Sequence, residues 1–160
     1  KSMTLIRDTR SLIPLEPAEG DRVLAISAAR AFPAGADQRD GAFAAQAARR
    51  FGGADILVDA SPTSEQIAAC AAQASKSRYV IVACRDAVFD PSQQALVNAV
   101  CTVNPNTIVV CMGLPYDANL FPQAGAVLCA WESTPLSIAS AVRVLAGDAD
   151  AQGVSPVSLG

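Results

Sequence analysis

With 160 residues the chain is long enough for one domain, and its 51% hydrophobic and 17% charged residues indicate a packed core and exclude a disordered chain. The net charge of −3 and the absence of a basic stripe argue against nucleic acid and anionic membranes as partners. No apolar run approaches the ~20 residues of a membrane span, and no signal peptide opens the sequence. Because the chain begins at Lys1 rather than Met, we expect a piece of a longer protein, and the missing signal then says nothing about the compartment.

Residues 1–20 are predicted to form a linker-like lead-in segment, and residues 21–160 a single domain. Within the lead-in, a short apolar stretch is followed by a charged turn and a second, Pro-containing apolar stretch. This pattern indicates a segment packed along the outside of the domain. Its apolar side chains have to be covered by the domain or by a partner; they are Leu5, Ile6, Leu12, Ile13 and Leu15.

Strand and helix patterns alternate through the rest of the chain. Runs of β-branched and apolar residues predict strands at residues 22–27, 55–60, 78–84, 107–111 and 125–131. Helices are predicted at residues 41–51, 61–75, 92–103 and 134–146, with Ser61 as a candidate N-cap and Gly52 and Gly147 as C-caps. Such alternation is typical of βαβ units. We therefore predict an α/β fold, a doubly wound and mostly parallel sheet of five or six strands with helices on both faces.

The stretch at residues 104–122 is expected to form the centre of this fold. Its strand, Thr107–Cys111, is uninterrupted by polar side chains other than Thr107, which indicates burial on both faces of a parallel sheet. Gly113 and Pro115 then end the strand pattern. The loop that follows would lie at the carboxyl edge of the sheet, where ligands and partners of open α/β sheets usually bind.

Several motifs of α/β enzymes are absent. No GxGxxG follows the first predicted strand, where Ser27 and Ala28 stand instead, and no GxxxxGK[ST] phosphate-binding loop occurs. The same two residues replace the acidic residues of a receiver-like site. The sequence has no GxSxG elbow and no His, which excludes Ser-His and Cys-His nucleophile pairs. These absences argue against a dinucleotide site, a phosphate-binding loop and a Ser-His or Cys-His nucleophile pair, and we predict no cofactor.

The five cysteines form no CxxC pair, and an odd number does not describe a disulfide framework. They lie in apolar helical or strand contexts, so we expect buried, reduced thiols. Without His, their spacing offers no zinc site, and we predict no metal centre. Free cysteines favour a cytoplasmic location over an oxidising one.

The remaining polar and aromatic residues of interest follow the predicted strands and would lie at the carboxyl rim. The loops at residues 85–91 and 114–122 combine aromatic and aliphatic residues with few charges, as interfaces do. A binding cleft or a partner interface is one interpretation, and loop solvation with a local Arg85–Asp86 pair is the other. The rim or interface candidates are Arg85, Asp86, Phe89, Tyr116, Asp117 and Phe121.

Both ends of the sequence and its central loop resemble family-three glycoside hydrolases. The family's two domains are linked by a Lys-Ser-hydrophobic-Thr-Leu-Leu-Arg stretch that leads into Leu-Pro-Leu. The matching residues here are Lys1, Ser2, Thr4, Leu5, Arg7, Pro14 and Leu15, with Ile6 and Ile13 as apolar replacements.

The central loop, residues 113–117, is similar to that family's Asn-Pro-Tyr-Asp segment, with Leu114 where Asn is frequent. The C-terminal residues Gly153, Pro156 and Val157 resemble its closing Gly-Lys-Leu-Pro-Val, with Ser155 in the Leu place. The resemblance thus extends from the first residue of the chain to its last.

The resemblance implies the second domain of such an enzyme, an α/β sandwich packed on a catalytic (β/α)-barrel, in the bacterial β-N-acetylglucosaminidase-like branch. In that branch the nucleophilic Asp and the His-containing acid/base loop lie on the barrel, and the Lys-His-Phe-Pro-Gly motif is absent here. The implied partner is the barrel of the same parent chain, with carbohydrate near the interface left open. The parent protein would be a glycoside hydrolase, and this segment alone is predicted to be a non-catalytic accessory domain.

Two alternatives stay open. One is a freestanding flavodoxin-like module that binds a small ligand at the rim. The other is a domain that supplies one acid/base carboxylate to a β-glucosidase-type barrel. Glu65 and Glu132 are the Glu residues in the body of the domain, and neither lies in a motif that matches this role.

Overall fold

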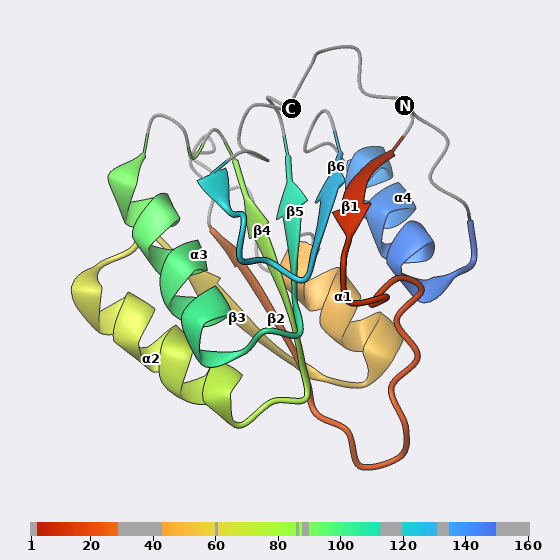
Figure 1. Ribbon diagram of the computed structural model, residues 1–160, viewed down its shortest axis with the longest axis horizontal. Coiled ribbons are helices and arrows are strands. Elements are labelled where there is room, and N and C mark those ends of the chain that lie inside the picture. The colour runs from red at the N-terminus through yellow and green to blue at the C-terminus, as the bar shows by residue number, and fades with distance from the viewer. Residues whose placement is uncertain are drawn as a thin grey trace.

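The computed structural model describes residues 3–28, 43–59, 61–85, 87, 90–112, 120–130 and 135–149, with the side chains of 135–137 outside this description. Its centre is a six-stranded sheet in the order β1-β6-β5-β4-β2-β3 (Figure 1). The strands are β1 (Thr4–Asp8), β2 (Val23–Ala28), β3 (Ala54–Val58), β4 (Tyr79–Cys84), β5 (Thr107–Cys111) and β6 (Ala126–Cys129).

Five of these strands are parallel, and β1 pairs antiparallel with β6 at one edge. Counted along the chain, the parallel strands have the order 2-1-3-4-5, which is the flavodoxin-like form of the doubly wound sheet. The predicted α/β class and mostly parallel sheet are therefore confirmed. The sixth strand comes from the segment predicted as a lead-in.

In the described part of the chain, four helices cover the sheet in two layers (Figure 1). The helices α1 (Phe43–Phe51) and α4 (Pro135–Ala146) lie on one face, and α2 (Ser64–Ser75) and α3 (Pro91–Val103) lie on the other. None of these helices, within the ranges that the structure describes, is long and apolar enough to cross a membrane.

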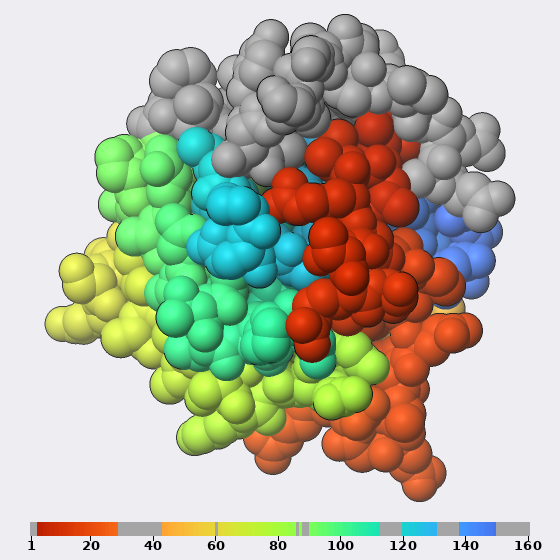
Figure 2. Space-filling view, in the orientation of Figure 1, coloured from red at the N-terminus to blue at the C-terminus, as the bar shows by residue number. Residues whose placement is uncertain are grey.

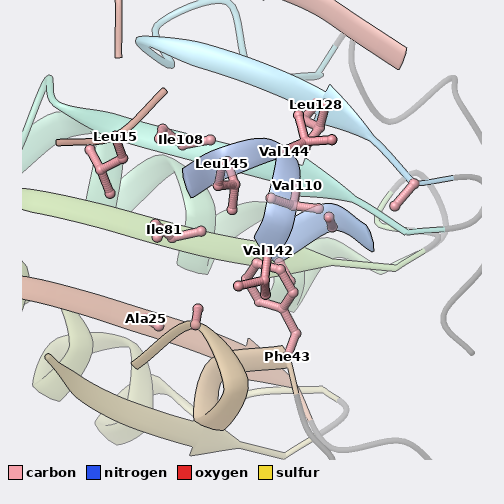
Figure 3. Packing of buried hydrophobic residues seen from close by; sticks show 14 of the residues in the cluster. Leu15, Ala25, Phe43, Ile81, Ile108, Val110, Leu128, Val142, Val144 and Leu145 are labelled. Carbon is pink, nitrogen blue, oxygen red and sulfur yellow. The ribbon is translucent and has the colours of Figure 1, made fainter. Parts of the chain in front are cut away.

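Alternate residues of the central strands point into two separate hydrophobic cores. Core cluster one lies between the sheet and the helices α1 and α4, and core cluster two lies between the sheet and the helices α2 and α3. Ile81 and Ile108 belong to core cluster one, where α4 contributes Leu145 and the lead-in contributes Leu15 (Figure 3). Their neighbours in sequence, such as Val82, face core cluster two beneath α2 and α3. This period of two, with both faces buried, is the reason that β4 and β5 are continuous apolar runs in the sequence.

Helix ends follow local signals, with one correction. Gly52 and Gly147 have φ values of +67° and +82°, so the left-handed C-caps predicted there are confirmed. The predicted cap Ser61 is wrong, because Thr63 caps α2: its hydroxyl accepts from the Gln66 N–H at 3.1 Å. The Gln66 side chain accepts in return from the Thr63 N–H at 3.1 Å, which completes a capping box.

The lead-in is built into the domain rather than lying outside it. Beyond β1, the Asp8 carboxylate accepts from the backbone N–H groups of Leu12 and Ile13 at 2.7 and 2.9 Å. This turn buries Leu12 and Leu15, which are 5% and 3% exposed, and the Leu15 N–H donates to the Leu145 carbonyl at 2.6 Å. Figure 2 shows the red N-terminal segment lying against the cyan residues 120–130. The domain thus covers Leu12 and Leu15 itself, whereas Leu5 stays 40% exposed.

Asn104 joins several elements at the amino edge of the sheet. Its side-chain amide donates to the carbonyls of Ala74 and Ser77 at 3.0 and 2.8 Å, at the end of α2. Its side-chain oxygen accepts from the Asn106 N–H at 2.9 Å, just before β5. The residue is 6% exposed, and its three hydrogen bonds link the end of α2 to the start of β5.

We expect Asn104→Ala to lower the free energy of unfolding by about 2–3 kcal/mol, because one buried and two partly buried hydrogen bonds are lost together, each worth about 1 kcal/mol. Urea denaturation of the purified chain measures this. The matched control is Asn98→Ala on α3, a half-buried residue whose side-chain contact to Gln123 is exposed, with an expected change within about 0.5 kcal/mol. Equal losses in the two variants would contradict the assignment.

Candidate functional site

The strand order places the candidate site at the carboxyl ends of β2 and β4. The chain passes from β2 to β3 on one side of β2 and then returns to β4 on the other side of β2. The two connections therefore diverge between β2 and β4. Ligands of doubly wound folds bind at such a point. Ser27, near the end of β2, is 5% exposed, and its hydroxyl accepts from the Ala44 N–H at 3.2 Å. This buried hydroxyl therefore links β2 to the start of α1.

A polar network holds the loop after β4 against the start of α3. The buried Gln93 side chain accepts from the Arg85 N–H at 2.9 Å and donates to the Arg85 carbonyl at 3.0 Å. Asp90 caps α3 by accepting from the N–H groups of Ser92 and Gln93 at 3.0 and 3.3 Å. The Ser61 hydroxyl, from the loop after β3, donates to the other Asp90 oxygen at 2.9 Å. The network joins two neighbouring rim loops to one helix.

The environment of Asp90 keeps its carboxylate ionised. Desolvation by itself would raise the pKa of Asp90, but the hydrogen bonds from Ser61, Gln93 and Ser92 outweigh it and lower the pKa below its ordinary value. Asp90 is therefore an anchor for loop structure. A general acid has to be protonated at the working pH, and this carboxyl group is poorly suited to that role.

Sequence reasoning missed Gln93 and Asp90, although a signal for both was present. Asp90-Pro-Ser-Gln93 has a cap residue followed three positions later by Gln, and Thr63-Ser-Glu-Gln66 repeats the spacing. This is the sequence signature of a capping box. In both cases the Gln side chain also reaches beyond its own helix: Gln66 accepts from the Asp59 N–H at 3.2 Å, and Gln93 binds Arg85.

Two of the six predicted rim residues lie in the described part of the chain. Arg85 follows directly after β4 and is exposed. Phe121 is 0% exposed and packs in core cluster two, while its backbone carbonyl accepts a hydrogen bond from the Arg7 guanidinium. It is a core residue and not an exposed anchor, because the segment before β6 turns inward over α3. The other four lie outside the described residues: Asp86, Phe89, Tyr116 and Asp117.

All five cysteines are buried, as predicted, and none is in a disulfide. Burial raises the pKa of Cys70 to about 11, and it raises that of Cys101 to about 11 in spite of the nearby Arg7 charge. Both thiols are therefore protonated at neutral pH. Within the described ranges, no group of three Cys, Asp or Glu residues is placed to hold one metal ion.

Comparison with known proteins assigns the fold to a family. The model of the glycosyl hydrolase family 3 C-terminal domain matches residues 3–160. The chain belongs to this family. No match was found among curated proteins.

Solved structures share the fold of this family 3 C-terminal domain. A family 3 β-N-acetylglucosaminidase from Paenibacillus sp. str. FPU-7 is 23% identical with a TM-score of 0.82, over 98% of this chain and 30% of that one. A β-glucosidase from Listeria innocua is 14% identical with a TM-score of 0.70, over 92% of this chain and 24% of that one. A family 3 β-glucosidase from Bifidobacterium adolescentis is 15% identical with a TM-score of 0.66, over 91% of this chain and 25% of that one. The chain thus spans less than a third of the length of these proteins.

The Asp90 cap can be tested by two substitutions. Asp90→Ala is expected to cost about 1 kcal/mol of stability, whereas Asp90→Asn, which still caps the helix, costs less at neutral pH. Because the pKa of Asp90 is lowered in the folded chain, its ionised form adds stability above pH ~4 and this contribution is lost as the pH falls through the folded-state pKa.

Urea titrations at several pH values compare the unmodified chain with Asp90→Asn. The stability difference should be largest near neutral pH and shrink as the pH falls below about 4. A difference that is constant with pH would show that the charge of Asp90 does not stabilise the cap.

Thiol accessibility tests the cysteine assignment. A bulky aromatic disulfide reagent at pH 8 should label the native chain at least about 100-fold more slowly than the urea-unfolded chain, because buried protonated thiols are poor nucleophiles. The labelled thiols are counted by absorbance in both states. Rapid native labelling of more than one thiol would contradict the burial of the set.

Proposed function

We propose that this chain is the non-catalytic accessory domain of a β-N-acetylglucosaminidase-like glycoside hydrolase, and that it packs on a catalytic barrel in the remainder of a longer chain. The observation on which this proposal rests is the family match over residues 3–160, in a chain that spans less than a third of its structural relatives. A domain of this extent leaves most of such an enzyme to be supplied by other residues.

The choice of branch is supported by structural similarity. The β-N-acetylglucosaminidase from Paenibacillus superposes with a TM-score of 0.82, compared with 0.70 and 0.66 for the two β-glucosidases. A second β-N-acetylglucosaminidase, a fungal multi-domain protein, has a TM-score of 0.75 at 22% identity. At these identities the likeness establishes the fold, and the substrate class is our proposal.

The chemistry of the described residues favours a structural role over a catalytic one. The chain contains no His, which removes the most common acid/base side chain. The polar groups at the carboxyl rim hold loops in place: Ser61 and Gln93 bind Asp90, and Gln93 binds the backbone of Arg85. These hydrogen bonds organise the rim as a shaped surface.

We propose that this rim is where the barrel docks. Arg85 is exposed beside the Gln93 network, and Asp86, Phe89, Tyr116 and Asp117 follow the same strand ends in the sequence. Aromatic residues and Arg are enriched at protein interfaces, which have a polar rim. Phe121 is left out of this proposal, because its side chain is buried within the domain.

The expected result for the isolated chain is no hydrolysis of an aryl β-N-acetylglucosaminide at pH 4 to 8. The full-length parent protein, made in parallel, should hydrolyse the same substrate. In the parent protein, Arg85→Ala should weaken the contact between the barrel and this domain more than it lowers the thermal midpoint of the isolated domain, because Arg85 is exposed and its backbone contacts to Gln93 remain.

Turnover by the isolated chain in proportion to its concentration would overturn the non-catalytic assignment. A parent protein that hydrolyses only aryl β-glucosides would overturn the assignment to the β-N-acetylglucosaminidase-like branch, while the assignment to family 3 would stand. A gene that encodes the domain alone would favour the freestanding ligand-binding alternative.

A further inference from the structure

Three of the five cysteines form a row across neighbouring strands. Each is the last residue of its strand, and the register pairs Cys84 of β4 with Cys111 of β5, and Cys111 with Cys129 of β6. All three belong to core cluster two, so their side chains leave the same face of the sheet. They are 3%, 0% and 0% exposed, and none is in a disulfide.

The spacing of this row matches a two-thiolate metal unit. Neighbouring strands lie about 4.8 Å apart, and side chains in register stand roughly perpendicular to the sheet. This geometry predicts a separation of about that distance between adjacent sulfurs. Metal–thiolate bonds of about 2.3 Å give a linear S–M–S unit a span of about 4.6 Å. A disulfide needs Cβ atoms about 3.8 Å apart, which is shorter than the strand spacing and would pull the ladder together.

Charge and ligand number restrict the metal ion. A divalent ion with two thiolates is neutral, whereas a monovalent ion leaves a negative charge among buried apolar side chains such as Leu96 and Phe121. Zinc needs four ligands, and within the described residues no group of three Cys, Asp or Glu is placed to bind one ion. Soft ions that accept two ligands in a line remain.

We propose that Cys111, together with Cys84 or Cys129, forms a buried two-thiolate site for a soft divalent cation with linear coordination, for which Hg(II) is the probe. Binding replaces two S–H bonds by two metal–sulfur bonds and releases two protons to water, with no change in oxidation state. The central position of Cys111 lets either neighbour complete the pair. This site is independent of the proposed role in a glycoside hydrolase.

The experiment measures retention of Hg(II) against a competing monothiol. The reduced chain receives one equivalent of mercuric chloride, and glutathione is added until half of the metal is removed, as followed by native mass spectrometry. The unmodified chain should hold one ion with the loss of two protons. It should also melt at a higher temperature, because the folded chain holds the two thiols side by side, whereas the unfolded chain has to close a loop to pair them.

Matched variants locate the site. Cys111→Ala should release the ion at about 100-fold less glutathione, since the second thiolate no longer acts at high effective concentration. Cys84→Ala/Cys129→Ala, which isolates Cys111 and serves if Cys111→Ala does not fold, should show the same loss. Cys84→Ala alone, Cys129→Ala alone and the control Cys70→Ala/Cys101→Ala should retain the ion.

Unchanged retention in Cys84→Ala/Cys129→Ala would overturn the proposal, as would its loss in Cys70→Ala/Cys101→Ala. Equal retention of Zn(II) would overturn the linear geometry. A mass decrease of two hydrogen atoms without metal would show a disulfide, formed by air oxidation, in place of the site and would also overturn the proposal.

Discussion

The structure depends on the burial of β4 and β5 on both faces. From Val80 to Cys84 and from Thr107 to Cys111 the side chains are almost wholly removed from water, and both strands use their backbone groups in parallel ladders. A sheet of this kind is stable only when helices cover each face, because either face left open would expose a continuous apolar surface. The two helical layers and the long crossovers between strands follow from that requirement.

The lead-in shows how the edge of such a sheet is completed. β1 pairs with β6, and the Asp8 turn then directs Leu12 and Leu15 into core cluster one. Close packing fixes this path: a Cβ on Gly125 would approach the Leu12 side chain to 2.7 Å, and one on Gly147 would approach Pro14 to 2.8 Å. The sheet therefore includes residues on both sides of the predicted division at residue 20.

The carboxyl rim illustrates how polar residues serve structure near a place where α/β folds usually carry chemistry. In the caps of α2 and α3, the Gln at the third helical position also binds a backbone N–H of a loop. Gln66 binds the loop after β3, and Gln93 binds the loop after β4. At the α3 cap, hydrogen bonds from Ser61, Gln93 and Ser92 lower the pKa of Asp90, and the buried Gln93 amide is satisfied by Arg85 and Asp90. A rim built in this way presents a defined surface, which suits docking of another domain.

The sequence by itself determined the fold class, the parallel strands, the C-terminal caps at Gly52 and Gly147, and the burial of the cysteines, because each follows from local period or backbone preference. Only the tertiary structure decided three other features. The pairing of β1 with β6 joins residues more than 100 positions apart, and the inward turn of Phe121 depends on its contact with a different part of the chain. The alignment of Cys84, Cys111 and Cys129 depends on strand register, which is set by packing between segments and leaves no mark in any one of them.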